Sequence, residues 1–208
     1  MGTRMESIIL LGTGGHAHSV VDCIEAENRF HIYGFLDIEE KIGEEYRGYK
    51  VLGTDMLLED SFKKGIKNAF VTIGYLGKNS IRHRLFFNLK KIGFTLPNII
   101  DKTAIIAKDV VLGEGIFIGK RTVVNSDVEI KDMCIINTGA IIEHDCKIGD
   151  FSHISVGSVL CGGVQVGRES FIGANATIIQ GRTIGNKCII GAGVTIRKNI
   201  KDNSIVRC

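Results

Sequence analysis

The chain has 208 residues, of which 44% are hydrophobic, so it is long enough for one or two domains with buried cores. Its net charge is +3, and residues 1–100 hold 13 basic and 12 acidic side chains while residues 101–208 hold 13 and 11. This even mixture offers no basic tract for nucleic acid or an anionic membrane. No apolar run approaches the roughly 18 residues of a membrane span, and the start lacks the form of a signal peptide. We therefore predict a cytoplasmic protein with no nucleic-acid or membrane partner.

The first half of the chain alternates predicted strands and helices. Apolar runs typical of buried strands lie at residues 7–11, 32–36 and 69–73. Helical patterns follow these runs at residues 16–28, directly after Thr54, which is the expected N-cap, and at residues 80–92. Alternation of this kind indicates a small parallel α/β sheet. We predict a Rossmann-like half domain over residues 1–97 and a second domain over residues 98–208.

A glycine-rich segment, Gly12-Thr13-Gly14-Gly15, joins the first strand to the first helix. Its spacing lets backbone N–H groups and a helix N-terminus hold a phosphate. Asp37 ends the next strand, where an acidic side chain commonly meets a ribose hydroxyl. The competing interpretation is that these glycines only permit a tight turn. Because the domain is half of a dinucleotide fold, we predict a nucleoside-diphosphate site that includes Gly12, Gly14, Gly15 and Asp37.

Two further residues are candidates for the same pocket. His16 lies at the mouth of the glycine loop, within reach of a bound phosphate or sugar, although an ordinary exposed histidine is the plainer interpretation. A second loop at residues 74–78 enters the helix predicted at residues 80–92. Arg82, near the first turn of that helix, is a candidate phosphate ligand, and the alternative is a solvated surface arginine.

From residue 100 to residue 196 every sixth residue is aliphatic, without interruption. An α-helix places residues six apart on nearly opposite faces, so this period excludes a helical core. It is typical of a parallel β-helix, in which each repeat is one short strand and a turn, and three repeats close a triangular coil. The side chains expected to stack in the interior are Ile100, Ile106, Leu112, Ile118, Val124, Ile130, Ile136, Ile142, Ile148, Ile154, Leu160, Val166, Ile172, Ile178, Ile184, Ile190 and Ile196.

Small residues precede many of these aliphatic residues by two positions and are expected to point inward as well. Cys134, Cys146 and Cys188 fall in this register, where a cysteine serves as a small hydrophobe. The cysteine spacings match no zinc pattern, so we expect free thiols and no metal.

Two histidines interrupt the bland surface of the repeats. His144, within Glu143-His144-Asp145, comes two residues after an interior aliphatic, so it should point outward near a corner of the coil. Its acidic neighbours can orient the ring, and an imidazole with a pKa near 6.5 suits proton transfer at neutral pH. His153 follows nine residues later. Ordinary surface histidines are the alternative; we favour a catalytic role for His144 and leave His153 open.

These segments together resemble bacterial acyltransferases that join an N-terminal nucleotide-sugar-binding domain to a left-handed hexapeptide-repeat β-helix. The group includes UDP-4-amino-sugar N-acetyltransferases, perosamine-type N-acetyltransferases and sialic acid O-acetyltransferases. The resemblance covers nearly the whole chain and rests on the glycine loop with His16, on Gly34-Phe35-Leu36-Asp37, on Asn137-Thr138 and on residues 143–153. Ile38 departs from the pattern, because the group usually has an acidic pair at this point, and the departure weakens a uridine assignment.

The resemblance implies direct transfer from acetyl-CoA in a homotrimer, with active sites between neighbouring β-helices. It implies that His144 is the general base, supported by Asp145, with Asn137 also in the active site. His153 aligns with a residue near the acetyl carbonyl, where an N–H donor stabilises the developing oxyanion. The positions that align with backbone contacts to the coenzyme are Gly162, Ala174 and Ala192, and those that align with the nucleotide-sugar pocket are His16, Asp37 and Arg82.

We therefore predict an acetyl-CoA-dependent N-acetyltransferase acting on the amine of a nucleotide-linked amino sugar, with a UDP-linked sugar expected first. The principal alternative is O-acetylation of sialic acid or a related sugar, which the same base would serve. A non-catalytic nucleotide-sugar-binding solenoid is a third possibility, and it requires His144 to have no chemical role. A nicotinamide dehydrogenase would require tight binding of NAD.

Overall fold

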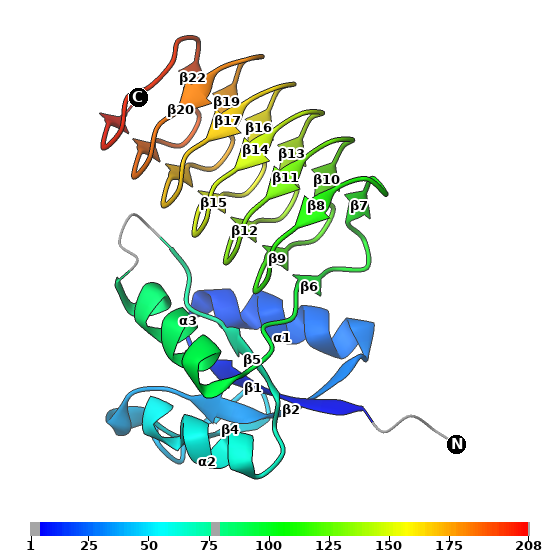
Figure 1. Ribbon diagram of the computed structural model, residues 1–208, viewed down its shortest axis with the longest axis vertical. Helices are drawn as coiled ribbons and strands as arrows, with labels where there is room; N and C mark the ends of the chain where they lie inside the picture. Colours follow the sequence, from blue (N-terminus) through cyan, green and yellow to red (C-terminus); the bar gives the residue numbers. More distant parts are fainter. Residues whose placement is uncertain (1–4, 76–79, 208) are drawn as a thin grey trace. The chain divides into compact units, whose positions relative to one another are not determined.

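The computed structural model describes residues 5–75 and 80–207 (Figure 1). The chain forms two compact units. The first comprises the residues up to Gly74 together with Ser80–Pro97, and the second comprises the segment that starts at Tyr75 together with the residues from Asn98 onward. Residues 76–78 of the second predicted loop lie outside the described residues.

A sheet with the strand order β3-β4-β2-β1-β5 forms the centre of the first unit. β1, β2, β4 and β5 are parallel, and β3 pairs antiparallel with β4. The apolar runs explain the central position of β1, because Ile8, Ile9 and Leu10 are completely buried. The strands are β1 (Glu6–Leu11), β2 (Phe30–Leu36), β3 (Glu45–Tyr46), β4 (Tyr49–Gly53) and β5 (Asn68–Val71).

The hairpin between β3 and β4 has no counterpart in the sequence prediction. Its turn is Arg47-Gly48, with φ angles of 52° and 83°. Two-residue hairpin turns of this kind need positive φ at both positions, and Asn-Gly or Asp-Gly usually signals them. Arginine gives no such signal, so the hairpin is hidden in the sequence.

The predicted helices of the first unit are confirmed. α1 (Gly15–Glu27) ends at Asn28, whose φ of 56° is the left-handed conformation that commonly closes a helix. Thr54 is a cap, since its side chain accepts a hydrogen bond from the Met56 N–H at 3.4 Å. The remaining helical segments are η1 (Glu39–Lys41), η2 (Asp55–Leu57), α2 (Leu58–Lys63) and α3 (Ser80–Ile92).

In the second unit, two-residue strands stack into three parallel sheets that form the faces of a left-handed β-helix (Figure 1). Apart from the first strand of each face, the strands up to β22 pair with the strand eighteen residues earlier, as in the pairing of Ile135 with Phe117. In the last pair, Ile205 lies beside Ile189, sixteen residues earlier. The first face contains β6 (Ile99–Ile100), β9 (Phe117–Ile118), β12 (Ile135–Ile136), β15 (His153–Ile154), β18 (Phe171–Ile172), β21 (Ile189–Ile190) and β23 (Ile205–Val206). The second face contains β7 (Ile105–Ile106), β10 (Val123–Val124), β13 (Ile141–Ile142), β16 (Val159–Leu160), β19 (Thr177–Ile178) and β22 (Thr195–Ile196). The third face contains β8 (Val111–Leu112), β11 (Glu129–Ile130), β14 (Lys147–Ile148), β17 (Gln165–Val166) and β20 (Thr183–Ile184).

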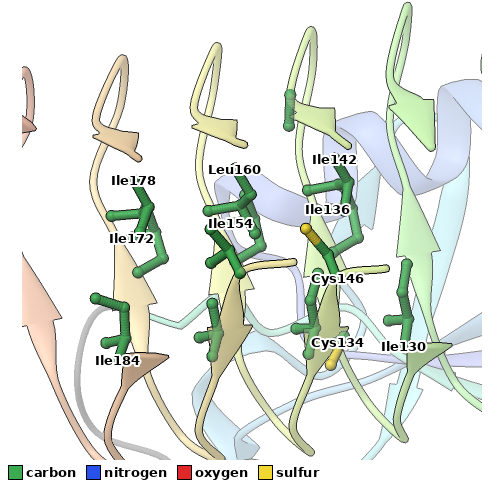
Figure 2. Close-up of a cluster of buried hydrophobic side chains, with 14 of the residues drawn as sticks. Ile130, Cys134, Ile136, Ile142, Cys146, Ile154, Leu160, Ile172, Ile178 and Ile184 are labelled. Atoms are coloured by element: carbon green, nitrogen blue, oxygen red, sulfur yellow. The ribbon is translucent and has the colours of Figure 1, made fainter. Parts of the chain in front are cut away.

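The six-residue aliphatic series forms the interior of these coils, as predicted. Side chains from Ile118 to Ile196 in the series are buried and stack coil upon coil (Figure 2). Ile100, Ile106 and Leu112, in the first coil, are only half-buried because they cover the end of the stack. Cys134, Cys146 and Cys188 lie in the core as free thiols. Burial raises the pKa of the Cys146 thiol to about 11, so it is protonated at neutral pH.

Buried serines occupy the same inward-facing position of the repeat as these cysteines, and the serine hydroxyls form hydrogen bonds within the coils. Ser152 donates to the Gly167 carbonyl at 2.9 Å, Ser158 to Gly173 at 2.8 Å and Ser170 to Gly185 at 2.8 Å. Each bond reaches a backbone carbonyl fifteen residues later, so a buried polar group fastens one coil to the next without an unsatisfied donor.

Candidate active site

His144 lies in the turn between the second and third faces, which we call the second corner. Its neighbour Asp145 has a φ of 59°, a left-handed conformation that aspartate tolerates better than most residues. The turn brings the His144 Nδ1 to 2.7 Å from the Asp145 Oδ2, and 56% of the His144 side chain is exposed. The hydrogen bond that the imidazole donates to Asp145 raises the pKa of His144 above its usual value. In the neutral ring Nδ1 therefore carries the proton, and the exposed Nε2 is left as a proton acceptor.

A second cluster lies where the first face turns into the second, which we call the first corner. The His153 Nδ1 is 2.8 Å from the backbone carbonyl oxygen of Tyr75, and its Nε2 is 3.3 Å from the Asn137 Nδ2. A carbonyl oxygen only accepts, so Nδ1 donates, and Nε2 of the neutral ring accepts from the Asn137 amide. The Asn137 Oδ1 in turn accepts from the Thr138 N–H at 2.8 Å. The amide of Asn137 is thus held at both ends.

His153 is not an ordinary surface histidine. Only 7% of it is exposed, and its ring packs edge-on against Phe171 with centroids 5.2 Å apart. The Tyr75 ring packs against the same Phe171, and its hydroxyl donates to the Glu169 carbonyl. The imidazole N–H of His153 is donated to the Tyr75 carbonyl oxygen. The contact with the acetyl carbonyl that the family resemblance implies for His153 stays a prediction. Tyr75 is absent from the sequence prediction, since a residue that acts through its carbonyl has no side-chain signature.

The second face separates the two clusters within one chain. Between the turn that follows Asn137 and the turn that holds His144, about four extended residues form one side of the coil. At about 3.3 Å per residue this side measures roughly 13 Å. His144 and the Asn137–His153 pair therefore lie at different corners of the coil, separated by one face.

The three positions predicted to contact the coenzyme divide between the same two corners. Ala174 lies in the first-corner turn two coils beyond the turn that follows Asn137, and Ala192 lies one coil further. Gly162 lies at the second corner, one coil beyond His144 and directly against its imidazole.

The glycine loop of the first unit leaves space at the start of α1. Gly12 has a φ of 106° and lies against Ile73, so the backbone and packing require glycine there. Gly14 is the N-cap of α1 and Gly15 is its first residue, and a Cβ added at either one would meet no atom within 4 Å. Packing within the protein does not explain these two glycines, and the open space in front of a helix N-terminus suits an anion.

Asp37 fastens this loop to the end of β2. Its carboxylate accepts hydrogen bonds from the Thr13 N–H at 2.7 Å, from the Thr13 hydroxyl at 2.5 Å and from the Ile38 N–H at 2.8 Å. The Lys41 ammonium adds an ion pair at 3.1 Å. Burial acts to raise the pKa of Asp37, but these donors outweigh it and hold the pKa below its usual value. Asp37, the predicted ribose-binding residue, thus accepts hydrogen bonds from the protein's own glycine loop. The sequence analysis did not identify Thr13 and Lys41 as its partners.

A cavity of about 430 Å³ opens beside this loop within the first unit. Its polar lining includes Asp37, Glu39, Glu40 and the ion pair between Arg84 and Asp55. Its apolar lining includes Leu11, Ile38, Ile73, Ile81 and Leu85. The volume and mixed lining suit a nucleoside part of a ligand.

His16 and Arg82 do not line this cavity. His16 is half-buried beside Gly74, and Arg82 is 2% exposed rather than solvated. Across residues 5–75 and 80–207 we find no group of three metal-binding side chains. None of the helices in these ranges is long and apolar enough to cross a membrane.

The chain matches known families and solved structures over most of its length. Residues 7–89 match the PglD N-terminal domain, and residues 163–198 match the bacterial transferase hexapeptide repeats. PerB from Caulobacter crescentus, solved with CoA and GDP-perosamine, is 33% identical with a TM-score of 0.91 over 99% of this chain and 95% of that chain. The acetyltransferase domain of PglB from Neisseria gonorrhoeae is 31% identical with a TM-score of 0.88, over 98% and 97% of the two chains.

An uncharacterized protein of Acanthamoeba polyphaga mimivirus is 34% identical over 112 residues, which are 54% of this chain and 21% of that protein. The matched part of the chain thus spans about one fifth of the length of that curated relative.

The stacked hexapeptide coils and the match to the bacterial transferase hexapeptide repeats place the second unit among the hexapeptide-repeat transferases. Given 33% identity over nearly the whole length of a solved relative, the chain belongs to the acetyl-CoA-dependent sugar acetyltransferases that carry a PglD N-terminal domain.

Proposed function

We propose that the protein transfers the acetyl group of acetyl-CoA to the amine of a nucleotide-linked amino sugar, with His144 as the general base. The observation that carries the proposal is the 2.7 Å hydrogen bond from the His144 Nδ1–H to the Asp145 carboxylate, which leaves Nε2 of the imidazole as the acceptor. The complex of PerB with CoA and GDP-perosamine and the complex of the PglB domain with acetyl coenzyme A support the two substrates, since the coenzyme and a nucleotide-linked sugar are bound to proteins of the same family.

In the proposed step the sugar nitrogen attacks the thioester carbonyl carbon while His144 Nε2 takes a proton from the amine. The new carbon–nitrogen bond forms, the carbon–sulfur bond breaks, and the CoA thiolate leaves and takes up a proton. The negative charge that develops on the carbonyl oxygen needs a fixed N–H donor. We assign this role to the second N–H of Asn137, because His153 and Thr138 already hold that amide in one orientation.

We further propose that each active site forms between two copies of the chain in a homotrimer. Asp145 and His144 at the second corner are separated from Asn137 and His153 at the first by roughly 13 Å of extended chain, at about 3.3 Å per residue. A neighbouring copy that brings its first corner to this second corner completes the set. Light scattering at micromolar concentration should give a trimer, and a monomer with full activity would contradict the shared site.

The nucleotide is the part of the substrate that we assign to the first unit. The sequence favours a UDP-linked sugar, but Ile38 stands where the family usually has the second acid of a pair, and the PerB complex contains a GDP-linked sugar. We therefore propose a GDP-linked amino sugar first and a UDP-linked one second. The diphosphate would lie beside Gly14 and Gly15, and the nucleobase would lie in the adjoining cavity.

The test is thiol release from acetyl-CoA with GDP- and UDP-linked 4-amino sugars, beside free and CMP-linked sialic acids. Turnover with an amino sugar, lowered roughly 10² to 10⁴-fold in His144→Ala, is the expected result. Turnover with sialic acids alone would replace N-acetylation by O-acetylation. Wild-type turnover in His144→Ala would remove the general base from the mechanism.

A further inference from the structure

The turn that holds His144 recurs in the same form along the second corner. In four successive coils the second residue of this turn is in the left-handed conformation: Asp127 has a φ of 59°, Asp145 of 59°, Gly163 of 69° and Gly181 of 66°. The first residue of the turn has no positive φ in any of them. The residues at this first position are Ser126, His144, Gly162 and Gln180. The backbone thus accepts serine, histidine and glutamine here, and it does not require the glycine at position 162.

The neighbour that excludes a side chain at Gly162 is the imidazole of His144. A Cβ added at Gly162 would lie 2.6 Å from the His144 Nε2, 2.7 Å from its Cε1 and 3.3 Å from its Cδ2. At other coil glycines the obstacle differs. At Gly167 the nearest atom is the backbone nitrogen of Asn186 at 2.6 Å, and at Gly173 it is the backbone nitrogen of Ala192 at 2.6 Å, whereas at Gly157 it is the side-chain oxygen of Asn175. The space next to the Cα of Gly162 is therefore occupied by one side chain, that of His144, which is the proposed general base.

The two contacts of the imidazole fix the ring from opposite edges. Asp145, in the same turn, holds Nδ1 at 2.7 Å. The edge that carries Cε1 and Nε2 lies over the Cα of Gly162 in the next coil. Any side chain at position 162 would displace the ring, and with it the nitrogen that takes the proton.

We propose that Gly162 is a positioning residue, whose missing side chain provides the seat of the His144 imidazole and sets where Nε2 meets the acceptor amine. This inference rests on the proposed function, in which His144 is the base. It gives Gly162 a role different from the backbone contact to the coenzyme that the family resemblance implies. The two roles predict different kinetics, because a seat for the base acts on kcat and a coenzyme contact acts on the KM for acetyl-CoA.

The experiment is a double-mutant cycle of Gly162→Ala with His144→Ala, with kcat and both KM values measured. A displacement of about 1 Å at a reacting group can lower the rate roughly 100-fold. We expect a loss of this order in kcat for Gly162→Ala, an unchanged KM for acetyl-CoA, and no further loss when His144 is already alanine. Gln180→Ala, at the same turn position two coils beyond His144, is the matched control and should have wild-type kcat.

A second readout does not depend on activity. The imidazole signal of His144 is identified by NMR through its loss in His144→Ala, and is then titrated in the wild type and in Gly162→Ala. A displaced ring loses its hydrogen bond to Asp145, so the pKa of His144 should fall toward its ordinary value. If Gly162→Ala fails to fold, the same alanine should be tolerated in the His144→Ala background, which the thermal melting temperature reports.

Three results would overturn the inference. The first is an equal loss of kcat from Gly162→Ala in both backgrounds, which would indicate a coenzyme or backbone role. The second is a wild-type titration of His144 in a folded Gly162→Ala protein. The third is failure to fold in both backgrounds. Wild-type turnover of His144→Ala would instead remove the general base itself, and the proposed mechanism would fail together with its positioning residue.

Discussion

Glycines serve opposite purposes in the loop that starts α1 and in the coils of the β-helix. At Gly14 and Gly15 a Cβ would enter open space, whereas at Gly167 it would lie 2.6 Å from the backbone nitrogen of Asn186 in the next coil. Coil glycines such as Gly167 permit close stacking of the chain on itself, and the loop glycines keep a space that the chain does not fill. A glycine in this protein is therefore interpreted by what its missing side chain would touch. At Gly162 the imidazole of His144, the proposed base, occupies that space.

The largest effect is expected at a coil glycine away from both proposed site corners. Gly167 lies in the turn between the third and first faces. Alanine there is overpacked against the next coil and should lower the free energy of unfolding by about 1–3 kcal/mol. Thermal unfolding measures this loss, and the kcat of the folded protein should stay at its wild-type value. Unchanged stability would mean that the coils separate at little cost.

The loop glycine should give the reverse pattern. Gly14→Ala should change the free energy of unfolding by no more than about 0.5 kcal/mol, because its Cβ meets nothing in the protein. The added methyl group enters the space assigned to the diphosphate, so the KM for the nucleotide sugar should rise about tenfold, or about 1.4 kcal/mol. The KM for acetyl-CoA serves as the internal control. A destabilised protein with an unchanged KM for the nucleotide sugar would indicate that the glycines only permit a tight turn.

The smallest effect concerns pH and separates the charge of Asp145 from its packing. His144 must be neutral to accept a proton, so kcat/KM should rise as pH increases through the pKa of the imidazole. The hydrogen bond that His144 donates to Asp145 raises this pKa, and Asp145→Asn removes the negative charge. The rising limb should therefore move to lower pH in Asp145→Asn, and the move should be small because both side chains of the pair are exposed. A limb that stays in place would assign the titration to another group.

The sequence predicts the β-helix well because its six-residue period is a property of side chains alone. The aliphatic series identifies the interior, and the position of His144 two residues after Ile142 places it at an exposed corner. The same logic identifies the strand and helix that flank the glycine loop. These features depend on local patterns, which a single sequence contains.

What the sequence does not reveal depends on contacts between distant segments. The burial of His153 follows from Tyr75, which is 78 residues away and acts through a backbone carbonyl. The burial of Arg82 likewise has no local signal, because an arginine near a helix start is usually solvated. The partnership of Gly162 with His144 lies in the spacing of eighteen residues, which is visible in the sequence only once the coil length is known.

The position of the corner residues along the β-helix also affects how the protein can open. A solenoid is held together only by neighbouring repeats, so opening begins at an exposed end and proceeds inward. Asn137, His144, His153 and Gly162 belong to two adjacent coils, with the coils of β6 to β11 before them and those of β18 to β22 after them. Fraying of the terminal coils at either end thus leaves these residues in place. Amide hydrogen exchange should be fastest in the outermost coils and slowest around β12 to β17, so that the proposed site is in the last part of the β-helix to open.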